Sequence, residues 1–117
     1  GNNHVTSTND PTAHAEVMAI RDACKNLNTF QLNGCVLYTS CEPCPMCFGA
    51  IYWARLDKVY YSANRHMASY HGFDDSFIYD EVNLSFDRRR IPFIHVSPEK
   101  GVVPFREWDN KENKVKY

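Results

Sequence analysis

The sequence lacks long hydrophobic runs and any strong imbalance of charge. Its longest apolar run extends only from Phe48 to Ala54, whereas a membrane-spanning helix needs about 20 apolar residues. The formal net charge is −1 at pH 7, so the chain has none of the basic excess that proteins use to hold long nucleic acids. We therefore expect no membrane and no nucleic acid as partners, and a small molecule as the ligand.

The sequence also shows no secretory leader, and its cysteine content does not suit a disulfide framework. It contains five cysteines, and an odd number without a leader argues against an extracellular disulfide-bonded domain. We expect a reducing compartment, the cytoplasm, in which thiols remain available for a metal. These cysteines are Cys24, Cys35, Cys41, Cys44 and Cys47.

The hydrophobic pattern predicts an α/β fold in a single domain, residues 1–117. Hydrophobic residues make up 44% of the chain, which is enough for one core. Asp10 and Pro11 are typical of a helix start, and an apolar stripe predicts a helix from there to Leu27. Residues 35–39 and 57–62 are β-like and flank a helix predicted over 45–55. Strand, helix and strand at this spacing predict a parallel pair.

The remainder of the chain gives weaker patterns. Residues 63–76 have irregular or weakly helical character around Gly72. Residues 92–97 are rich in β-branched and aromatic side chains and predict a third strand. Residues 104–117 form a charged tail that is compatible with a helix.

Two short motifs carry metal-binding and acid–base side chains, and each lies at a predicted helix start. They are His14-Ala15-Glu16 and Pro43-Cys44-Pro45-Met46-Cys47. Cysteines three residues apart share one face of a helix, and the positive helix N-terminus favours the thiolates that zinc needs. Because helical side chains tilt toward the N-terminus, His14 and Glu16 can both reach a metal beyond the helix end. We therefore predict one zinc ion held by His14, Cys44 and Cys47.

This ligand set predicts a catalytic site. Three protein ligands leave a fourth coordination position for water, which distinguishes catalytic from structural zinc. A carboxylate beside that position can take a proton from the water and return it to the substrate. Glu16 is the candidate for this role.

Two other interpretations of the cysteines explain less of the sequence. Cys41, Cys44 and Cys47 match the start of an iron–sulfur motif, but no fourth cysteine follows. The Cys44–Cys47 spacing also occurs in redox pairs. Neither alternative accounts for His14 and Glu16, and the other cysteines fit small buried positions.

The two motifs together form the signature of zinc deaminases. The chain resembles the cytidine-deaminase-like superfamily and, within it, the bacterial guanine deaminases. Residues 10–17 and 39–47 are similar also to tRNA adenosine deaminases, whereas three further stretches resemble guanine deaminases. These are GAIYWAR at 49–55, GFDDSFIY at 72–79 and the tail ending in Tyr117. The resemblance implies a three-layer αβα fold with a central mixed sheet, of which the N-terminal helix and first strands are missing from this sequence.

The resemblance also implies a reaction, a substrate and an assembly. The reaction is the hydrolysis of guanine to xanthine and ammonia, in purine catabolism or salvage. The implied substrate-binding groups are Asn3, the backbone N–H of Ala15, Trp53, Asp75 and Tyr117. An aspartate acceptor suits the N–H donors of guanine. In this family residues 104–117 are exchanged between two subunits, which implies a homodimer in which Tyr117 closes the neighbour's site.

Two alternative functions remain open from sequence. A tRNA adenosine deaminase shares the zinc motifs, although the near-neutral charge and the acidic GFDD stretch disfavour it. A zinc-stabilised binding module without enzymatic activity would need a fourth protein ligand in place of water.

Overall fold

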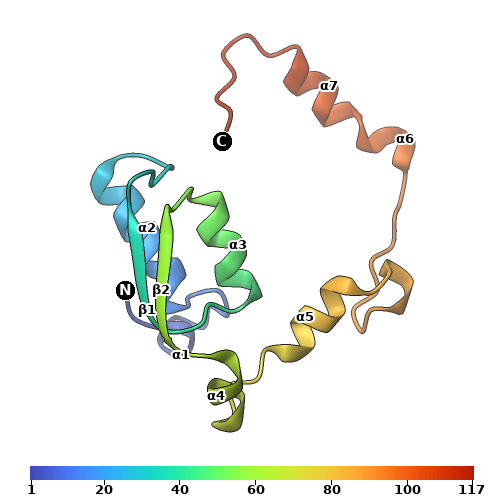
Figure 1. The fold of residues 1–117 in the computed structure, drawn as a ribbon. Helices are drawn as coiled ribbons and strands as arrows, with labels where there is room; N and C mark the ends of the chain where they lie inside the picture. The colour runs from blue at the N-terminus through green and yellow to red at the C-terminus, as the bar shows by residue number, and fades with distance from the viewer. The chain divides into compact units, whose positions relative to one another are not determined.

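The computed structural model describes residues 1–117, and the chain forms two compact units. The first unit comprises Gly1–Tyr79 and the second comprises Asp80–Tyr117. Both units are drawn in Figure 1. The prediction of a single domain over 1–117 stays a prediction.

The first unit alternates helices and strands. In chain order its elements are α1 (Val5–Thr8), α2 (Ala15–Leu27), β1 (Val36–Cys41), α3 (Pro45–Trp53), β2 (Lys58–Ala63) and α4 (Arg65–Tyr70). Helix α5 (Ser76–Asn83) begins in this unit and ends in the second. The α/β character and the order strand–helix–strand agree with the sequence-based prediction.

The sheet consists of β1 and β2, which pair in parallel as predicted. Val36 lies opposite Lys58 at one end and Cys41 lies opposite Ala63 at the other. The sheet of this chain therefore has two strands, which are parallel. A mixed sheet would also contain an antiparallel strand, and this sheet has none. The prediction of a third strand at 92–97 was wrong, because these residues pair with no other strand, and a lone strand leaves its backbone donors and acceptors unsatisfied.

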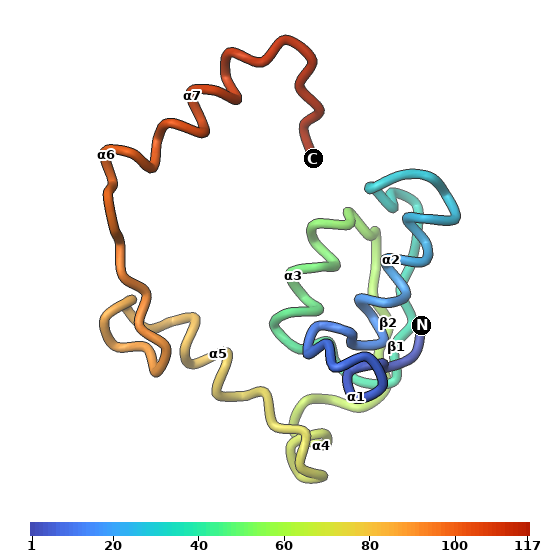
Figure 2. Tube along the Cα trace, turned by 180° about the vertical axis from the view of Figure 1, so that it is seen from behind, coloured from blue at the N-terminus to red at the C-terminus, as the bar shows by residue number.

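Helices α2 and α3 cover one face of this sheet, and the other face is open. In the two opposite views of Figures 1 and 2, both helices lie on the same side of the strands. The half-buried side chains of β1, such as Leu37 and Thr39, alternate with exposed ones. On the open face Tyr38 is 74% exposed and stacks on Tyr60, with ring centroids 5.0 Å apart. Few side chains are fully buried, and Cys47 is among them.

Helix α2 begins at Ala15, four residues later than the predicted start at Pro11. The reason is the side chain of Asp10, which accepts hydrogen bonds from the backbone N–H of Thr12 at 2.8 Å and from its hydroxyl at 2.7 Å. These bonds form a turn ahead of the helix, and short polar side chains such as aspartate commonly stabilise such turns. His14 consequently occupies the N-cap of α2 with an extended backbone, φ −66° and ψ 153°.

The second unit contains the end of α5, a 3₁₀ turn at Phe86–Arg88, α6 (Pro98–Gly101) and α7 (Val103–Asp109). The Arg89 guanidinium lies over the rings of both Phe86 and Phe93, at 4.6 and 4.8 Å. It also donates hydrogen bonds to the backbone oxygens of Val82 and Leu84. The predicted helical character of the tail is found only in α7, since residues 110–117 are not helical. None of the chain's helices has the length and apolarity to cross a membrane.

Candidate metal centre and active site

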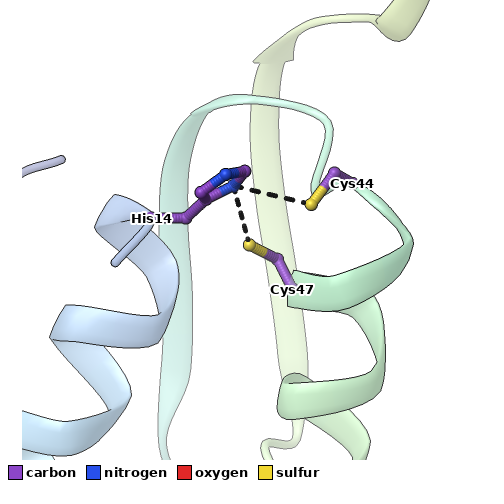
Figure 3. Close-up of side chains that lie close together, drawn as sticks. All are labelled: His14, Cys44 and Cys47. Carbon is purple, nitrogen blue, oxygen red and sulfur yellow. Dashed lines mark hydrogen bonds between the residues drawn. The ribbon is translucent and has the colours of Figure 1, made fainter. Parts of the chain in front are cut away.

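The predicted ligands His14, Cys44 and Cys47 converge at one point. The Nδ1 atom of His14 lies 3.6 Å from the sulfur of Cys44 and 3.6 Å from the sulfur of Cys47. Figure 3 shows the imidazole pointing toward both sulfurs. All three ligand atoms lie within 4.8 Å of one another. Zn–S bonds of about 2.3 Å and Zn–N bonds of about 2.0 Å, arranged tetrahedrally, separate sulfur from nitrogen by about 3.6 Å, so the donor set fits zinc.

Helix starts place these side chains. His14 is the N-cap of α2, and Cys44 is the N-cap of α3 with φ −63° and ψ 168°. Pro45 opens α3 because its missing N–H is not needed at a first helical position. Cys47 then lies in the first turn of α3, on the same side of the helix as Cys44. Two helix N-termini therefore meet at the site, and their positive ends favour thiolates.

The two thiols lose their protons with unequal ease. The pKa of Cys44 is lowered to about 6, chiefly because the Cys47 thiol donates a hydrogen bond to the Cys44 thiolate, and the nearby His14 adds to the effect. The pKa of Cys47 is raised by the same hydrogen bond, by burial and by the negative charges of Cys44 and Glu16. The pair thus holds one thiolate readily, and a bound cation is needed to displace the second proton.

A cavity of about 710 Å³ opens beside these ligands, within the size range typical of small-molecule sites. Glu16 lies at its wall, and the Thr39 hydroxyl donates a hydrogen bond to Glu16 Oε1 at 3.4 Å. Because Glu16 is on the first turn of α2, it faces the same space as the His14 imidazole. A carboxylate in this position can accept and return protons beside the metal.

Three of the predicted substrate-binding residues also line this cavity, namely Asn3, Ala15 and Asp75. Two others lie elsewhere. Trp53 is at the end of α3, where it is 64% exposed, and it is not among the residues that line this cavity. Tyr117 belongs to the second unit, where it lines a cleft with Phe105 and Trp108.

Sequence reasoning missed one side of the cavity. Helix α4 and the turn that follows it contribute side chains that no motif singled out. The signal available was their position directly after β2, since ligand sites of α/β sheets gather beyond the carboxyl ends of parallel strands. These residues are Arg65, Met67, Ala68 and His71, and Phe73 of the GFDDSFIY stretch lines the cavity with them.

Comparison with known proteins agrees with this geometry at the level of the family. The model of the cytidine and deoxycytidylate deaminase zinc-binding region matches residues 1–63. The chain therefore belongs to the cytidine and deoxycytidylate deaminase family, whose α/β fold and zinc dependence the sequence predicted.

Within this family the chain is similar to guanine deaminases over its whole length. It is 56% identical to the guanine deaminase of Bacillus subtilis (strain 168) over 117 residues, which is 100% of this chain and 75% of that protein. It matches the crystal structure of guanine deaminase from Bacillus subtilis with a TM-score of 0.96, covering 98% of this chain and 73% of that one.

Similarity to tRNA deaminases is partial. The tRNA-specific adenosine deaminase of Aquifex aeolicus (strain VF5) is 52% identical over 61 residues, which is 52% of this chain and 40% of that protein. The stretches shared with guanine deaminase thus extend beyond the zinc motifs.

Proposed function

We propose that this chain catalyses the zinc-dependent hydrolysis of guanine to xanthine and ammonia. The observation that carries the proposal is the arrangement of one imidazole, two thiols and the Glu16 carboxylate around a single cavity. It is supported by 56% identity to a guanine deaminase over the whole chain. The group of potential ligands has three members, which leaves room for solvent in a tetrahedral site.

Each residue has a distinct role in this reaction. His14, Cys44 and Cys47 would hold the metal, and zinc in such a site supplies a Lewis acid that makes water nucleophilic at neutral pH. Glu16 takes a proton from that water and passes protons to a ring nitrogen and to the departing amine. Water and guanine thus yield xanthine and ammonia.

Groups around the cavity recognise the purine. The Asp75 carboxylate accepts hydrogen bonds from N–H groups of guanine, which adenine does not present in the same pattern. The side-chain amide of Asn3 and the backbone N–H of Ala15 complete the polar contacts. By resemblance to the family, Tyr117 would add aromatic surface to the bound base, whereas Trp53 lies outside the lining of this cavity.

We also propose that the chain acts as a homodimer in which residues 104–117 are exchanged between subunits. The resemblance to bacterial guanine deaminases supports this assembly. The exposed side chains of Phe105 and Tyr117 in the second unit are consistent with a tail that packs on another subunit. The proposed setting is purine catabolism or salvage in the cytoplasm.

The test uses the purified protein loaded with zinc. It is incubated separately with guanine, guanosine, adenosine, cytosine and a tRNA anticodon stem-loop, while ultraviolet spectra and ammonia release are followed. Guanine alone should be converted. Glu16→Ala should retain zinc and lose about 10²-fold or more of the rate. Conversion of the tRNA in place of guanine would establish the alternative tRNA deaminase, and full activity of Glu16→Ala would remove the proton-transfer role.

A further inference from the structure

The loop that delivers Cys44 to the metal centre is fixed by side chains outside the metal and substrate sets. This loop comprises Glu42 and Pro43, between the end of β1 and the start of α3. Its backbone is tied to β2, because the N–H of Glu42 donates to the carbonyl of Ala63 at 2.8 Å. This bond extends the pairing of β1 and β2 by one residue. Pro43 and Cys44, which follow, must therefore be positioned by contacts outside the sheet.

Glu42 makes the next contact through its side chain. Its Oε2 atom accepts a hydrogen bond from the backbone N–H of Arg65 at 3.0 Å. That N–H belongs to the first turn of α4, where helical N–H groups have no partner within the helix. The Glu42 carboxylate therefore connects the metal-ligand loop to the helix that walls the catalytic cavity.

Tyr79 makes the third contact from α5. Its hydroxyl donates a hydrogen bond to the carbonyl of Pro43 at 3.4 Å, and its ring lies under the Arg65 guanidinium at 4.8 Å. These contacts form a closed triangle of residues. Glu42 accepts a hydrogen bond from the backbone of Arg65, the Arg65 guanidinium packs on the ring of Tyr79, and the Tyr79 hydroxyl donates to Pro43, the residue after Glu42. Burial and the negative charge of Asp75 raise the pKa of Tyr79, so the phenol remains a donor at neutral pH.

The triangle also reaches the substrate side of the cavity. Asp75 immediately precedes α5, and its carbonyl accepts a hydrogen bond from the N–H of Ile78 at 3.0 Å. Tyr79 follows one turn later on the same helix, so anchoring its hydroxyl on Pro43 fixes the start of α5 relative to the metal loop. These contacts therefore fix the position of the Asp75 carboxylate, which would bind guanine, relative to the Cys44 thiol, which would bind zinc.

We propose that Glu42 and Tyr79 are positioning residues that join the Cys44 loop to the Asp75 segment, so that zinc retention and guanine binding depend on the same contacts. The part concerning guanine rests on the proposed function. The part concerning zinc stands independently of any substrate, because it concerns only the loop that places Cys44.

The decisive experiment measures zinc release from the full chain without substrate. Zinc-loaded protein is mixed with excess chelator, and the released zinc is followed with a metallochromic dye. Tyr79→Phe keeps the ring beneath Arg65 and removes only the hydroxyl. Glu42→Ala removes the acceptor, whereas Glu42→Gln keeps an oxygen that can accept from Arg65. We expect release to be roughly fivefold faster or more for Tyr79→Phe and Glu42→Ala, and near the original rate for Glu42→Gln.

Two exposed residues outside the triangle supply matched controls. Tyr70→Phe alters a tyrosine that is 87% exposed, and Glu99→Ala alters a glutamate of the second unit; both should release zinc at the original rate. If Glu42→Ala does not fold, as judged by circular dichroism, the conservative Tyr79→Phe variant decides the outcome. Release rates equal to the original for Tyr79→Phe would overturn the proposal.

Guanine kinetics separate positioning from chemistry. Tyr79→Phe, saturated with zinc, should show a raised KM for guanine and a kcat within about twofold of the original, because it displaces a binding group and leaves Glu16 in place. An unchanged KM would remove the link to Asp75. If the original protein converts no guanine, the proposed function fails while the zinc-release result still stands.

Discussion

At the residue scale, the unequal thiols of Cys44 and Cys47 make zinc binding dependent on pH. The pKa of Cys44 is near 6 and that of Cys47 is raised. Above pH 6, zinc binding should therefore displace one thiol proton, that of Cys47, and below pH 6 it should displace the protons of both thiols. The apparent affinity should fall by about tenfold per pH unit between pH 8 and 6, and by at least about a hundredfold per unit below pH 6. Chelator competition at several pH values measures this slope, and a constant slope across pH 6 would contradict the prediction.

The hydrogen bond from Thr39 to Glu16 gives a second prediction at this scale. Thr39→Val keeps the shape of the side chain but removes the donor at 3.4 Å from Glu16 Oε1. We expect kcat for guanine to fall by about three- to tenfold, as the loss of one hydrogen bond of ordinary strength allows, with zinc content unchanged. Thr39→Ser restores a hydroxyl and should recover most of the rate. If Thr39→Ser and Thr39→Val are equally slow, the hydroxyl has no role.

The candidate metal ligands could be predicted because each is tied to a local signal. Cys44 and Cys47 lie at the start of α3, which Pro45 marks in the sequence, and His14 belongs to a His-x-Glu motif at the N-terminal end of α2. Glu42 and Tyr79 could not be found in this way, because their partners are 23 and 36 residues away along the chain. No local pattern reports a contact that only the tertiary fold creates.

At the scale of elements, the cap of α4 is accessible to experiment. The Asn64 side chain accepts a hydrogen bond from the backbone N–H of Met67 at 2.9 Å, which satisfies one orphan donor at the start of a six-residue helix. Asn64→Ala should lower the free energy of unfolding by about 0.5–2 kcal/mol, as measured by urea denaturation of the zinc-loaded protein. Asn64→Asp retains the acceptor and serves as the control. Because α4 walls the catalytic cavity, Asn64→Ala should also raise KM.

Elements were predicted well where local and tertiary preferences agree. The pair β1 and β2 follows from the β-like runs at 35–39 and 57–62, and helix α3 begins at Pro45 as predicted. The start of α2 was misplaced, because the Asp10 side chain competes for the N–H of Thr12. Residues 92–97 have strand-like composition, yet a strand forms only where another strand offers its backbone.

At the scale of the whole molecule, the fully buried core is small, and zinc should supply much of the stability. The buried hydrophobic residues are Ala13, Leu32, Cys47, Ile51 and Ala54. One of them is itself a proposed ligand, and the metal would tie α2 to α3 at their N-termini. A ligand present at about a thousand times its dissociation constant stabilises a fold by about 4 kcal/mol. Removal of zinc should therefore lower Tm by at least about 10 °C in calorimetry. Treatment with a zinc-saturated chelator controls for effects of the chelator itself.

The exchange of tails between subunits predicts complementation between two inactive variants. Glu16→Ala lacks the proton carrier but keeps Tyr117, and Tyr117→Ala has the reverse defect. If the tail of one subunit closes the site of the other, a mixed dimer contains one intact site, formed by Glu16 of one copy and Tyr117 of its partner. Unfolding the two variants together in equal amounts and refolding them with zinc should give about half mixed dimers, and hence about a quarter of the original activity. A tail that closes its own site gives no gain over the separately refolded variants, because the mixed dimer then holds two defective sites. Guanine conversion after co-refolding thus distinguishes the two arrangements, with dimer formation checked by sedimentation.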